Sequence, residues 1–507
     1  MQKHNQQISA KHSIAALQKD TDKAYRILQR HHPKLYQFVA KAVLDYKIDS
    51  LKQTISTPLT SKEFYKKLAP VIAEVRQGHI SIAPPTKRYA KKVRKEFNKN
   101  KFEFYDLDFE KVEDAFLVKN YQGIDSTIVG DEVIKINDTP IEVLLKEYKT
   151  LFSSDGYNTT FKDRFTALRF SRMYFRDKGR LDSISITLKN KDSLYTKMFR
   201  RIPKDSTNKK PLSNDSLEIK KAPKLTKVER KLKKKKAKEK QKDNFKYGYI
   251  KSRKQYTRNL NFMGKDSTIA YLKIRSFTNG GYKDFYEESF KKIDSVKASH
   301  LIIDLRDNTG GRLVEIAKLY SYLVSEEFQF IKKGERLVNF PLTKTVIHGG
   351  SKVNVIGVLA SPVSFFIDLV KSSRKKGTKF YKFSSSKTEY KPNPINFKGK
   401  IYVLINGNSF SASSILSTNL HATKRAFFVG EETGGHYNGT VAGYFKNNKL
   451  PSSKINMSIG LFQIETPYQT AINGYGIKPD KEIIPTKEDR EAGRDPELEW
   501  ILTTIEE

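Results

Sequence analysis

Two apolar segments of the chain end in turns rich in serine and glycine, and these turns carry residues that could do chemistry. The stretch "INGNSFSASSI" (405–415) follows the apolar run "GKIYVL", and "LIIDLRDNTGG" (301–311) ends in a glycine pair. A serine on a sharp strand-to-helix turn exposes its hydroxyl, and the amides of a glycine turn can hold a negatively charged oxygen. Taken singly, each turn is more typical of a helix cap or a tight bend. Together, at one sheet edge, they favour acyl transfer.

The elements that would position these turns are strands alternating with helices from residue 246 onward. The expected strands are "STIAYLKI", "HLIIDLRD", "NVIGVLA", "KIYVLING" and "RAFFVGEE", with amphipathic segments between them. This alternation predicts an α/β core over 246–507 with a largely parallel sheet. Functional groups in such sheets gather at the carboxyl ends of the strands, where both turns lie.

The rest of the chain divides into a helical and a strand-rich part. Apolar residues recur at three- and four-residue steps over 13–100, which predicts an N-terminal helical region. Thr60 or Ser61 is the expected N-cap of one helix and Gly78 its stop, so that His79 follows a helix end. Alternating apolar residues with turn signals over 103–203 predict a small β-rich module.

Composition excludes several classes of protein. The 507 residues include no cysteine, which rules out disulfides, thiolate metal sites and a cysteine nucleophile. The nine histidines have no paired spacing such as H-E-x-x-H, so we expect no metal site and no cofactor. No apolar run approaches ~18 residues, so we expect no transmembrane segment.

Positive charge is concentrated in one lysine-rich stretch, 204–245. The net charge is +39, and the segment from Lys220 to Lys242 holds 13 basic and 2 acidic residues. Such a stretch is typical of a solvated insertion or flexible loop, and alternatively of a contact with an anionic envelope or another polyanion. Aromatic residues are not interleaved with the lysines, so no specific nucleic-acid partner is expected.

Several motifs in order along the chain resemble those of one serine peptidase family. They are "RQGHISI", "GIDSTIVGDEVIKIND", "LIIDLRDNTGG", "VLINGNSFSASSI", "FVGEETGG" and "GYGIKPDKEI". The family contains the C-terminal processing (tail-specific) peptidases, the tricorn core protease and interphotoreceptor retinoid-binding protein. The resemblance implies a crotonase/ClpP-like core and a PDZ-like module over 103–203. It also implies that Ser411 is the nucleophile and that the Ala412 amide, with that of Gly310 or Gly311, forms the oxyanion hole.

The sequence departs from the family pattern at the catalytic base. Processing peptidases use a lysine 25 positions after the serine, where this chain has His436. The tricorn-like branch implies His79 as the base instead, with His436 as an alternative base or a residue of the cleft. The glutamate that orients the histidine in that branch is replaced here by Asn473. A carboxylate could alternatively come from Glu431, Glu432 or Glu465.

The expected function is therefore hydrolysis of peptide bonds in polypeptide substrates through an acyl-enzyme. The alternative is a non-catalytic relative that binds a peptide or an apolar ligand on the same scaffold. A polyanion binder acting through the lysine-rich stretch is a third hypothesis. The expected location is the cell envelope, periplasmic or outer-membrane-associated, or outside the cell, with any leader absent from this chain.

Overall fold

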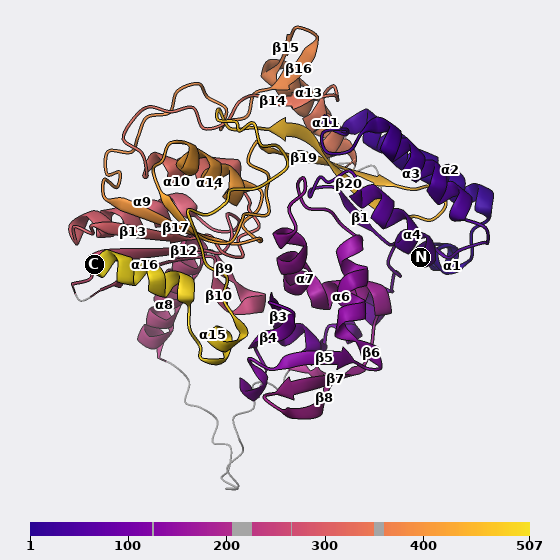
Figure 1. Cartoon of the computed structure of the whole chain (residues 1–507), viewed down its shortest axis with the longest axis horizontal. Coiled ribbons are helices and arrows are strands. Elements are labelled where there is room, and N and C mark those ends of the chain that lie inside the picture. Colours follow the sequence, from indigo (N-terminus) through magenta and orange to yellow (C-terminus); the bar gives the residue numbers. More distant parts are fainter. Residues whose placement is uncertain (124–125, 205–225, 265, 349–358) are drawn as a thin grey trace.

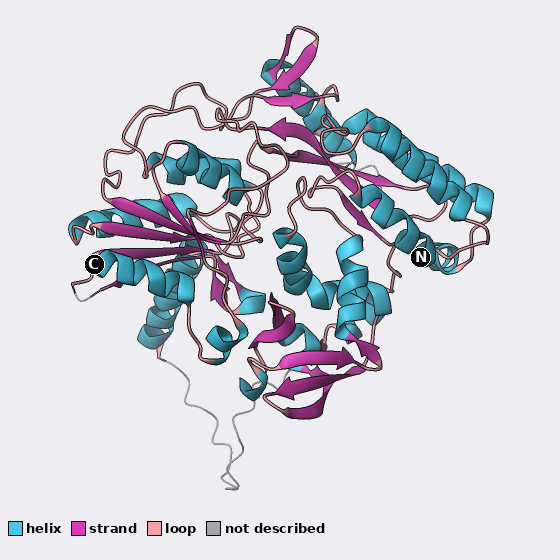
Figure 2. Ribbon diagram, in the orientation of Figure 1, coloured by secondary structure: helices cyan, strands magenta, loops and turns pink. Residues whose placement is uncertain are grey.

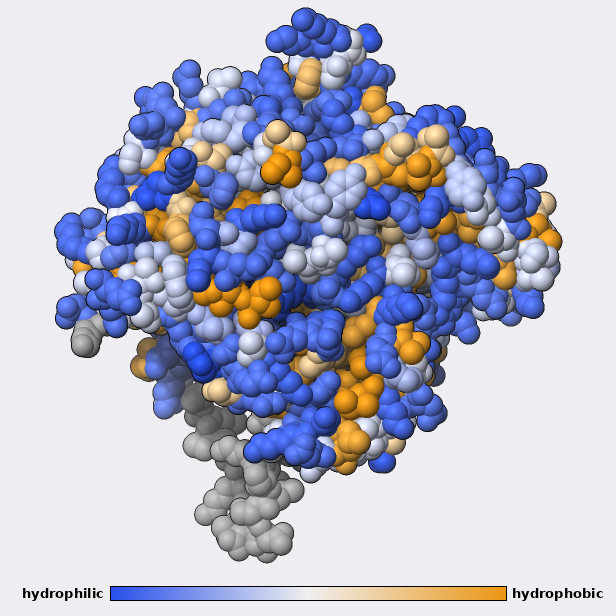
Figure 3. Space-filling model, in the orientation of Figure 1, coloured by the Kyte–Doolittle hydropathy of each residue, from blue (hydrophilic) through white to orange (hydrophobic). Residues whose placement is uncertain are grey.

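The structure, a computed structural model, describes residues 1–123, 126–204, 226–264, 266–348 and 359–507. It is a mixed helix and sheet structure with three large sheets, as Figures 1 and 2 show. Polar residues cover most of the face seen in Figure 3, and apolar residues gather there only in small groups. Within the described ranges, no helix combines the length and the apolarity that crossing a bilayer requires.

The N-terminal part is helical, as predicted, up to the strand that follows His79. Its helices are α1 (Gln2–Ser9), α2 (Ile14–His31), α3 (Lys41–Thr54), α4 (Ser61–Ala73) and α5 (Lys91–Phe97), and its strand is β1 (Ser81–Ala83). Thr60 is the N-cap of α4, in a capping box with Glu63. The helix ends at Ala73, before the predicted stop at Gly78, and an irregular segment leads to His79.

The middle of the chain forms a seven-stranded sheet covered by two helices. The strands are β2 (Asn100–Phe102), β3 (Leu107–Val112), β4 (Ala115–Tyr121), β5 (Glu132–Ile136), β6 (Thr139–Pro140), β7 (Ser183–Asn190) and β8 (Ser193–Pro203), and the helices are α6 (Ile141–Thr150) and α7 (Thr160–Lys178). Residues 124–125 of the glycine-rich motif lie outside the described residues. One face of α7 packs Phe170 and Tyr174 against Phe104, which lies in the turn of helix between β2 and β3, so its other face is turned outward.

The lysine-rich stretch is partly a helix. Residues 205–225 lie outside the described residues, whereas α8 (Lys227–Lys246) is a helix. A capping box of Thr226 and Glu229 starts the helix, and none of its residues is buried. It is a solvated helix because its sequence offers no apolar stripe to pack.

The expected parallel sheet is present from β12 onward. Its order is β11-β12-β13-β17-β18-β21, with β11 antiparallel at one edge and all other neighbours parallel. The strands are β11 (Arg258–Met263), β12 (Ile269–Ile274), β13 (His300–Asp304), β17 (Lys400–Ile405), β18 (Phe427–Gly430) and β21 (Lys481–Glu482). Helices α9 (Tyr282–Ser295), α10 (Leu313–Ser321) and α14 (Ala412–Ala422) lie on one side, and α16 (Pro496–Glu506) on the other (Figure 1). Residues 354–358 of the expected strand "NVIGVLA" lie outside the described residues.

A second six-stranded sheet joins the N-terminal part to this core. Its long hairpin is β19 (Thr440–Lys449) with β20 (Asn456–Ile464), and its other strands are β14 (Gly334–Arg336), β15 (Ser372–Lys375), β16 (Thr378–Tyr381) and β1. Nearby lie α11 (Pro341–His348) and α13 (Ser361–Lys371). Strand β1 pairs antiparallel with β20, with Ser81 opposite Ser458. This pairing carries His79 to the edge of the parallel sheet.

Candidate active site

The turn after β17 holds Ser411 in a strained backbone conformation. Its φ is 58° and its ψ is −116°, a region that residues other than glycine avoid at a cost of about 1–3 kcal/mol. Hydrogen bonds to the neighbouring turn, which follows β13, hold this geometry. The Phe410 amide and the Ser413 hydroxyl both donate to the carbonyl of Asn308, at 3.1 and 2.7 Å. The strain therefore presents the Ser411 hydroxyl at the start of α14.

His79 lies against this serine. Its Nε2 is 3.0 Å from Oγ of Ser411, and its Nδ1 is 2.9 Å from Oγ1 of Thr440. The imidazole also stacks on the ring of Phe410, with 4.8 Å between centroids. Burial lowers the pKa of His79 to about 4, so the ring is neutral at neutral pH. In the tautomer that carries its proton on Nδ1, the Thr440 oxygen accepts a hydrogen bond from Nδ1–H, and Nε2 is free to accept the proton of Ser411.

A buried carboxylate lies behind this pair. Oδ1 of Asp155 accepts a hydrogen bond of 2.7 Å from the amide of Gly78, the residue before His79. Burial raises the pKa of Asp155 to about 6, and the Gly78 amide, the Thr440 hydroxyl and the His436 amide oppose that rise. Among the described residues, Oδ2 of Asp155 has no hydrogen-bond partner. Thr440 therefore lies between the imidazole and a carboxylate with spare accepting capacity.

Backbone amides of both turns face the serine. The Gly310 amide is occupied, because it donates to Oδ1 of Asn308 at 2.9 Å. No acceptor for the amides of Gly311 and Ala412 is found in the part of the chain that the structure describes. The two turns touch, since a Cβ built on Gly310 would lie 2.8 Å from the nitrogen of Ala412. Among the described residues, Gly311 and Ala412 thus keep their amides free of an acceptor, and Gly310 allows the close approach of their turns.

A cleft of about 520 Å³ opens over these groups. Apolar side chains from α10, α14 and the β19–β20 hairpin line it together with the reactive groups. The lining includes His79, Gly311, Leu313, Val314, Ser411, Ile415, Thr440, Ala442, Phe445 and Ile464. Such a cleft can hold an extended chain with apolar side chains against the serine.

The other predicted candidates lie elsewhere. Asn473 is exposed and interacts with His436, so Thr440 occupies the position on His79 that the sequence suggested for Asn473. His436 is buried, and both ring nitrogens are bonded to backbone: Nδ1 to the carbonyl of Gly439 at 3.2 Å and Nε2 to the amide of Gly474 at 2.9 Å. It is absent from the cleft lining and fixes two loops together.

The three alternative carboxylates are bound away from the imidazole. Glu431 pairs with Arg164 at 3.0 Å, Glu432 accepts from the amide of Gly476 at 2.7 Å, and Glu465 lies 3.8 Å from Lys332. None of these three described residues bonds to His79. Sequence reasoning missed Thr440 and Asp155, because neither stands in a motif with a fixed spacing from the serine or the histidine.

Part of the chain matches a known peptidase family. Residues 268–483 match the model of peptidase family S41, which confirms the resemblance to the family of C-terminal processing peptidases. The described fold also resembles the structure of mature CPAF complexed with lactacystin, with a TM-score of 0.62 and 17% identity over 97% of this chain and 98% of that one. A structure of mature CPAF gives a TM-score of 0.58 and 17% identity, with 95% of each chain covered.

Two curated relatives are more similar in sequence over a shorter range. The chain is 27% identical over 218 residues to a carboxy-terminal-processing protease of Bartonella bacilliformis, which is 42% of this chain and 38% of that protein. It is 24% identical over 221 residues to the chloroplastic carboxyl-terminal-processing peptidase 1 of Arabidopsis thaliana, 43% of this chain and 34% of that protein. The match therefore spans less than half the length of these relatives.

Proposed function

We propose that the chain is a serine peptidase that hydrolyses peptide bonds in polypeptides through an acyl-enzyme. The observation that carries the proposal is the 3.0 Å contact between Nε2 of His79 and Oγ of Ser411. The amides of Gly311 and Ala412, which have no acceptor among the described residues, and the match of residues 268–483 to family S41 support it. The names of both curated relatives support a substrate cleaved near its carboxyl terminus.

In the first half of the reaction, Ser411 Oγ attacks the substrate carbonyl carbon while its proton passes to Nε2 of His79. The carbonyl oxygen becomes an oxyanion held by the amides of Gly311 and Ala412. Collapse of the tetrahedral intermediate breaks the C–N bond, and His79 returns its proton to the leaving amine. Water then attacks the ester with His79 again as the base, which releases the acid and restores Ser411.

The imidazolium formed in both steps needs support, because burial disfavours a charged His79. The Thr440 oxygen accepts a hydrogen bond from Nδ1–H of His79 and can direct its own hydroxyl toward Asp155. The carboxylate of Asp155 then supplies a negative charge that is separated from the imidazole by the Thr440 side chain. In this proposal Thr440 takes the orienting role that the sequence suggested for Asn473. Asp155 takes the charge-balancing role for which Glu431, Glu432 and Glu465 were the alternatives.

The finer architecture is proposed on the same grounds. The seven-stranded sheet with α6 and α7 supports a PDZ-like peptide-binding module over 103–203, beside an N-terminal helical region over 13–100. The parallel sheet with α10 and α14 supports a crotonase/ClpP-like core over 246–507. The exposed lysines of α8 support contact with an anionic envelope or polyanion, and a location in the cell envelope or outside the cell.

Casein hydrolysis by the whole chain tests the activity. Wild type, Ser411→Ala, His79→Ala and His436→Ala should be compared at equal folded fraction, judged by circular dichroism. We expect the first two variants to lose activity by about 10²–10⁴-fold or more, and folded His436→Ala to keep it. A wild type that cleaves no peptide would point to the alternative, a binding protein on this scaffold.

A further inference from the structure

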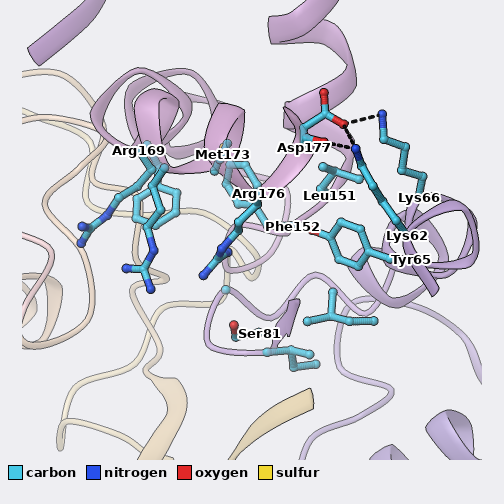
Figure 4. Close-up of a pocket in the computed structure, with 15 residues that line it drawn as sticks. Lys62, Tyr65, Lys66, Ser81, Leu151, Phe152, Arg169, Met173, Arg176 and Asp177 are labelled. Carbon is cyan, nitrogen blue, oxygen red and sulfur yellow. Dashed lines mark hydrogen bonds and ion pairs between the residues drawn. The ribbon is translucent and has the colours of Figure 1, made fainter. Parts of the chain in front are cut away.

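A second cavity borders the segment that carries His79, because Gly78 and Ile80 line it while His79 lines the cleft. It encloses about 280 Å³ between α7, α4, the α6–α7 loop and the segment that leads into β1 (Figure 4). We call it the arginine pocket. It is lined by Lys62, Tyr65, Lys66, Gly78, Ile80, Ser81, Ile82, Leu151, Phe152, Phe165, Arg169, Arg172, Met173, Arg176 and Asp177.

The outward face of α7 brings three arginines to this pocket. Arg169, Arg172 and Arg176 follow each other at steps of three and four residues, so they share one face of the helix. Figure 4 shows Arg176 reaching from α7 toward the segment that carries Ser81. The side chains of Arg169 and Arg176 are half-buried, and that of Arg172 is exposed.

The positive charge of these arginines is not neutralised within the described chain. The carboxylate that lines the pocket, Asp177, is already paired with Lys66 at 2.9 Å and with Lys178 at 3.1 Å. No carboxylate forms an ion pair with any of the three arginines among the described residues. Burial and the neighbouring Arg172 both lower the pKa values of Arg169 and Arg176. An anion in the pocket would relieve this repulsion.

The floor of the pocket is apolar and leads to the active site. Arg169 lies over the ring of Phe165, 5.6 Å from its centroid. Phe165 stacks on Phe161 at 4.8 Å, Phe161 on Phe410 at 4.4 Å, and Phe410 on His79 at 4.8 Å. A group bound on Phe165 therefore rests on a continuous aromatic stack that ends at the proposed base.

The pocket also borders an open strand edge. Ile80, Ser81 and Ile82 line it, and β1 is an end strand of its sheet, with β20 as its neighbour. An extended peptide can add to such an edge through main-chain hydrogen bonds and place alternate side chains on opposite sides. Arg169 and Arg176 lie about 10 Å apart along α7. Side chains on the same side of an added peptide strand are about 7 Å apart, so two of them fit within this length.

We propose that the arginine pocket is an exosite for an acidic segment of the polypeptide substrate, with side-chain carboxylates on Arg169, Arg172 and Arg176 and apolar side chains on the Phe165 floor. The proposal rests on the proposed peptidase function and names the substrate class. A neighbouring cavity of about 1190 Å³ extends the site, since it shares the three arginines and adds Lys101, Arg201 and Arg253. The three added cations are paired with Asp106, Asp182 and Asp108 respectively, so the charge left to bind the segment is that of the three arginines.

Binding to the Ser411→Ala protein tests this exosite without any need for turnover. The probe is a fluorescent peptide of alternating glutamate and leucine, blocked at both ends, and its twin has glutamine in place of glutamate. We expect the glutamate peptide to bind at least tenfold more tightly by fluorescence anisotropy, with the difference shrinking as salt rises. Equal affinity for the two peptides overturns the proposal.

A pair of charge-matched variants locates the binding. In the Ser411→Ala background, Arg172→Gln with Arg176→Gln should weaken binding of the glutamate peptide at least tenfold. Lys231→Gln with Lys235→Gln removes the same charge from exposed α8 and should change the dissociation constant less than twofold. Equal losses of affinity in both pairs of variants would mean that net charge alone attracts the peptide and would overturn the proposal.

Tight binding of a glutamine peptide with a free carboxyl terminus would show recognition of a chain end and would also overturn the proposal. Hydrolysis of casein by wild type is scored separately, so failure of the exosite and failure of the peptidase function are distinguishable.

Discussion

The hydroxyl oxygen of Thr440 lies 2.9 Å from Nδ1 of His79, although 361 residues of sequence separate the two. Strand β1 makes this contact possible, because it pairs with β20 and places the segment before it beside the start of β19. The imidazole is thereby fixed from both sides, with Ser411 on Nε2 and Thr440 on Nδ1. An imidazole fixed in this way needs no carboxylate in direct contact to keep the tautomer that a general base requires.

Replacement of Thr440 tests this orientation. Thr440→Val keeps the shape of the side chain but removes the acceptor on Nδ1, so the active tautomer loses its support. We expect kcat to fall between about tenfold and a thousandfold, with a smaller change in KM, because a general base contributes about 10²–10⁴-fold in total. Thr440→Ser restores the hydroxyl and should keep kcat within about threefold of wild type. Equal kcat values for the valine and serine variants would show that the contact is not used.

The pH profile of kcat/KM reports the state of the base. Burial lowers the pKa of His79 to about 4, and the base must be neutral to accept the serine proton. We therefore expect activity to persist at pH 5 and to disappear only as the pH falls through about 4. Peptide hydrolysis should be followed at each pH, with samples returned to pH 7.5 to confirm that the loss is reversible. Complete loss near 6.5, the ordinary histidine value, would contradict this environment.

Asp155 should add a smaller step to the same profile. Its pKa is raised to about 6 by burial, so its charge disappears below that pH and the imidazolium loses support. We expect kcat/KM to fall severalfold near pH 6 in wild type and to show no such step in Asp155→Asn, whose activity at pH 7.5 should already be reduced. An unchanged step in the asparagine variant would assign the titration to another group.

The same carboxylate should cost the fold stability at neutral pH. Because the pKa of Asp155 is higher in the folded chain than its ordinary value of 3.8, stability is lost as the pH rises from about 4 to 6. Asp155→Asn cannot ionise, and its side-chain oxygen can still accept from Gly78. Its Tm at pH 7.5 should therefore equal or exceed that of wild type, and the gap should close near pH 4. A lower Tm at pH 7.5 would contradict a net cost of burying the charge of Asp155.

His436 should matter for stability and not for proton transfer. His436→Ala leaves the buried carbonyl of Gly439 and the amide of Gly474 without partners, at a cost of about 1–3 kcal/mol for each group. We expect a clearly lower Tm, with kcat of the protein that remains folded within a fewfold of wild type. Thermal unfolding and active-site titration on one sample separate the two effects. An unchanged Tm with abolished hydrolysis would instead make His436 part of the chemistry.

Much of the core could be predicted from the sequence, because its strands are continuous apolar runs that end in recognisable turns. "KIYVLING" and "HLIIDLRD" carry Ser411 and the glycine pair to one sheet edge, as their alternation with helices implied. The partners of His79 could not be predicted in the same way. Thr440 and Asp155 meet it through the β1–β20 pairing and the Gly78 amide, which are long-range contacts without a local sequence pattern.

The positions of Asn473 and of the Gly310 amide differ from those that the motifs indicate, because each is bonded to another group. The motif match placed Asn473 on the imidazole, but Asn473 is exposed in the loop after Gln469 and interacts with His436. Gly310 was one of two candidate oxyanion donors, and its amide is occupied by the side chain of Asn308. A motif fixes the residue types of a site, whereas the occupancy of each amide depends on side chains outside the motif.

Activation of Ser411 by His79 is tested most directly by labelling with a fluorophosphonate. The reagent forms a covalent bond to an activated serine oxygen, and peptide mass spectrometry locates the modified residue. We predict stoichiometric labelling of Ser411 in wild type, none in Ser411→Ala, and labelling at least a hundredfold slower in folded His79→Ala. Labelling of Ser411 at the wild-type rate in His79→Ala, or no labelling of Ser411 in wild type, would contradict the account.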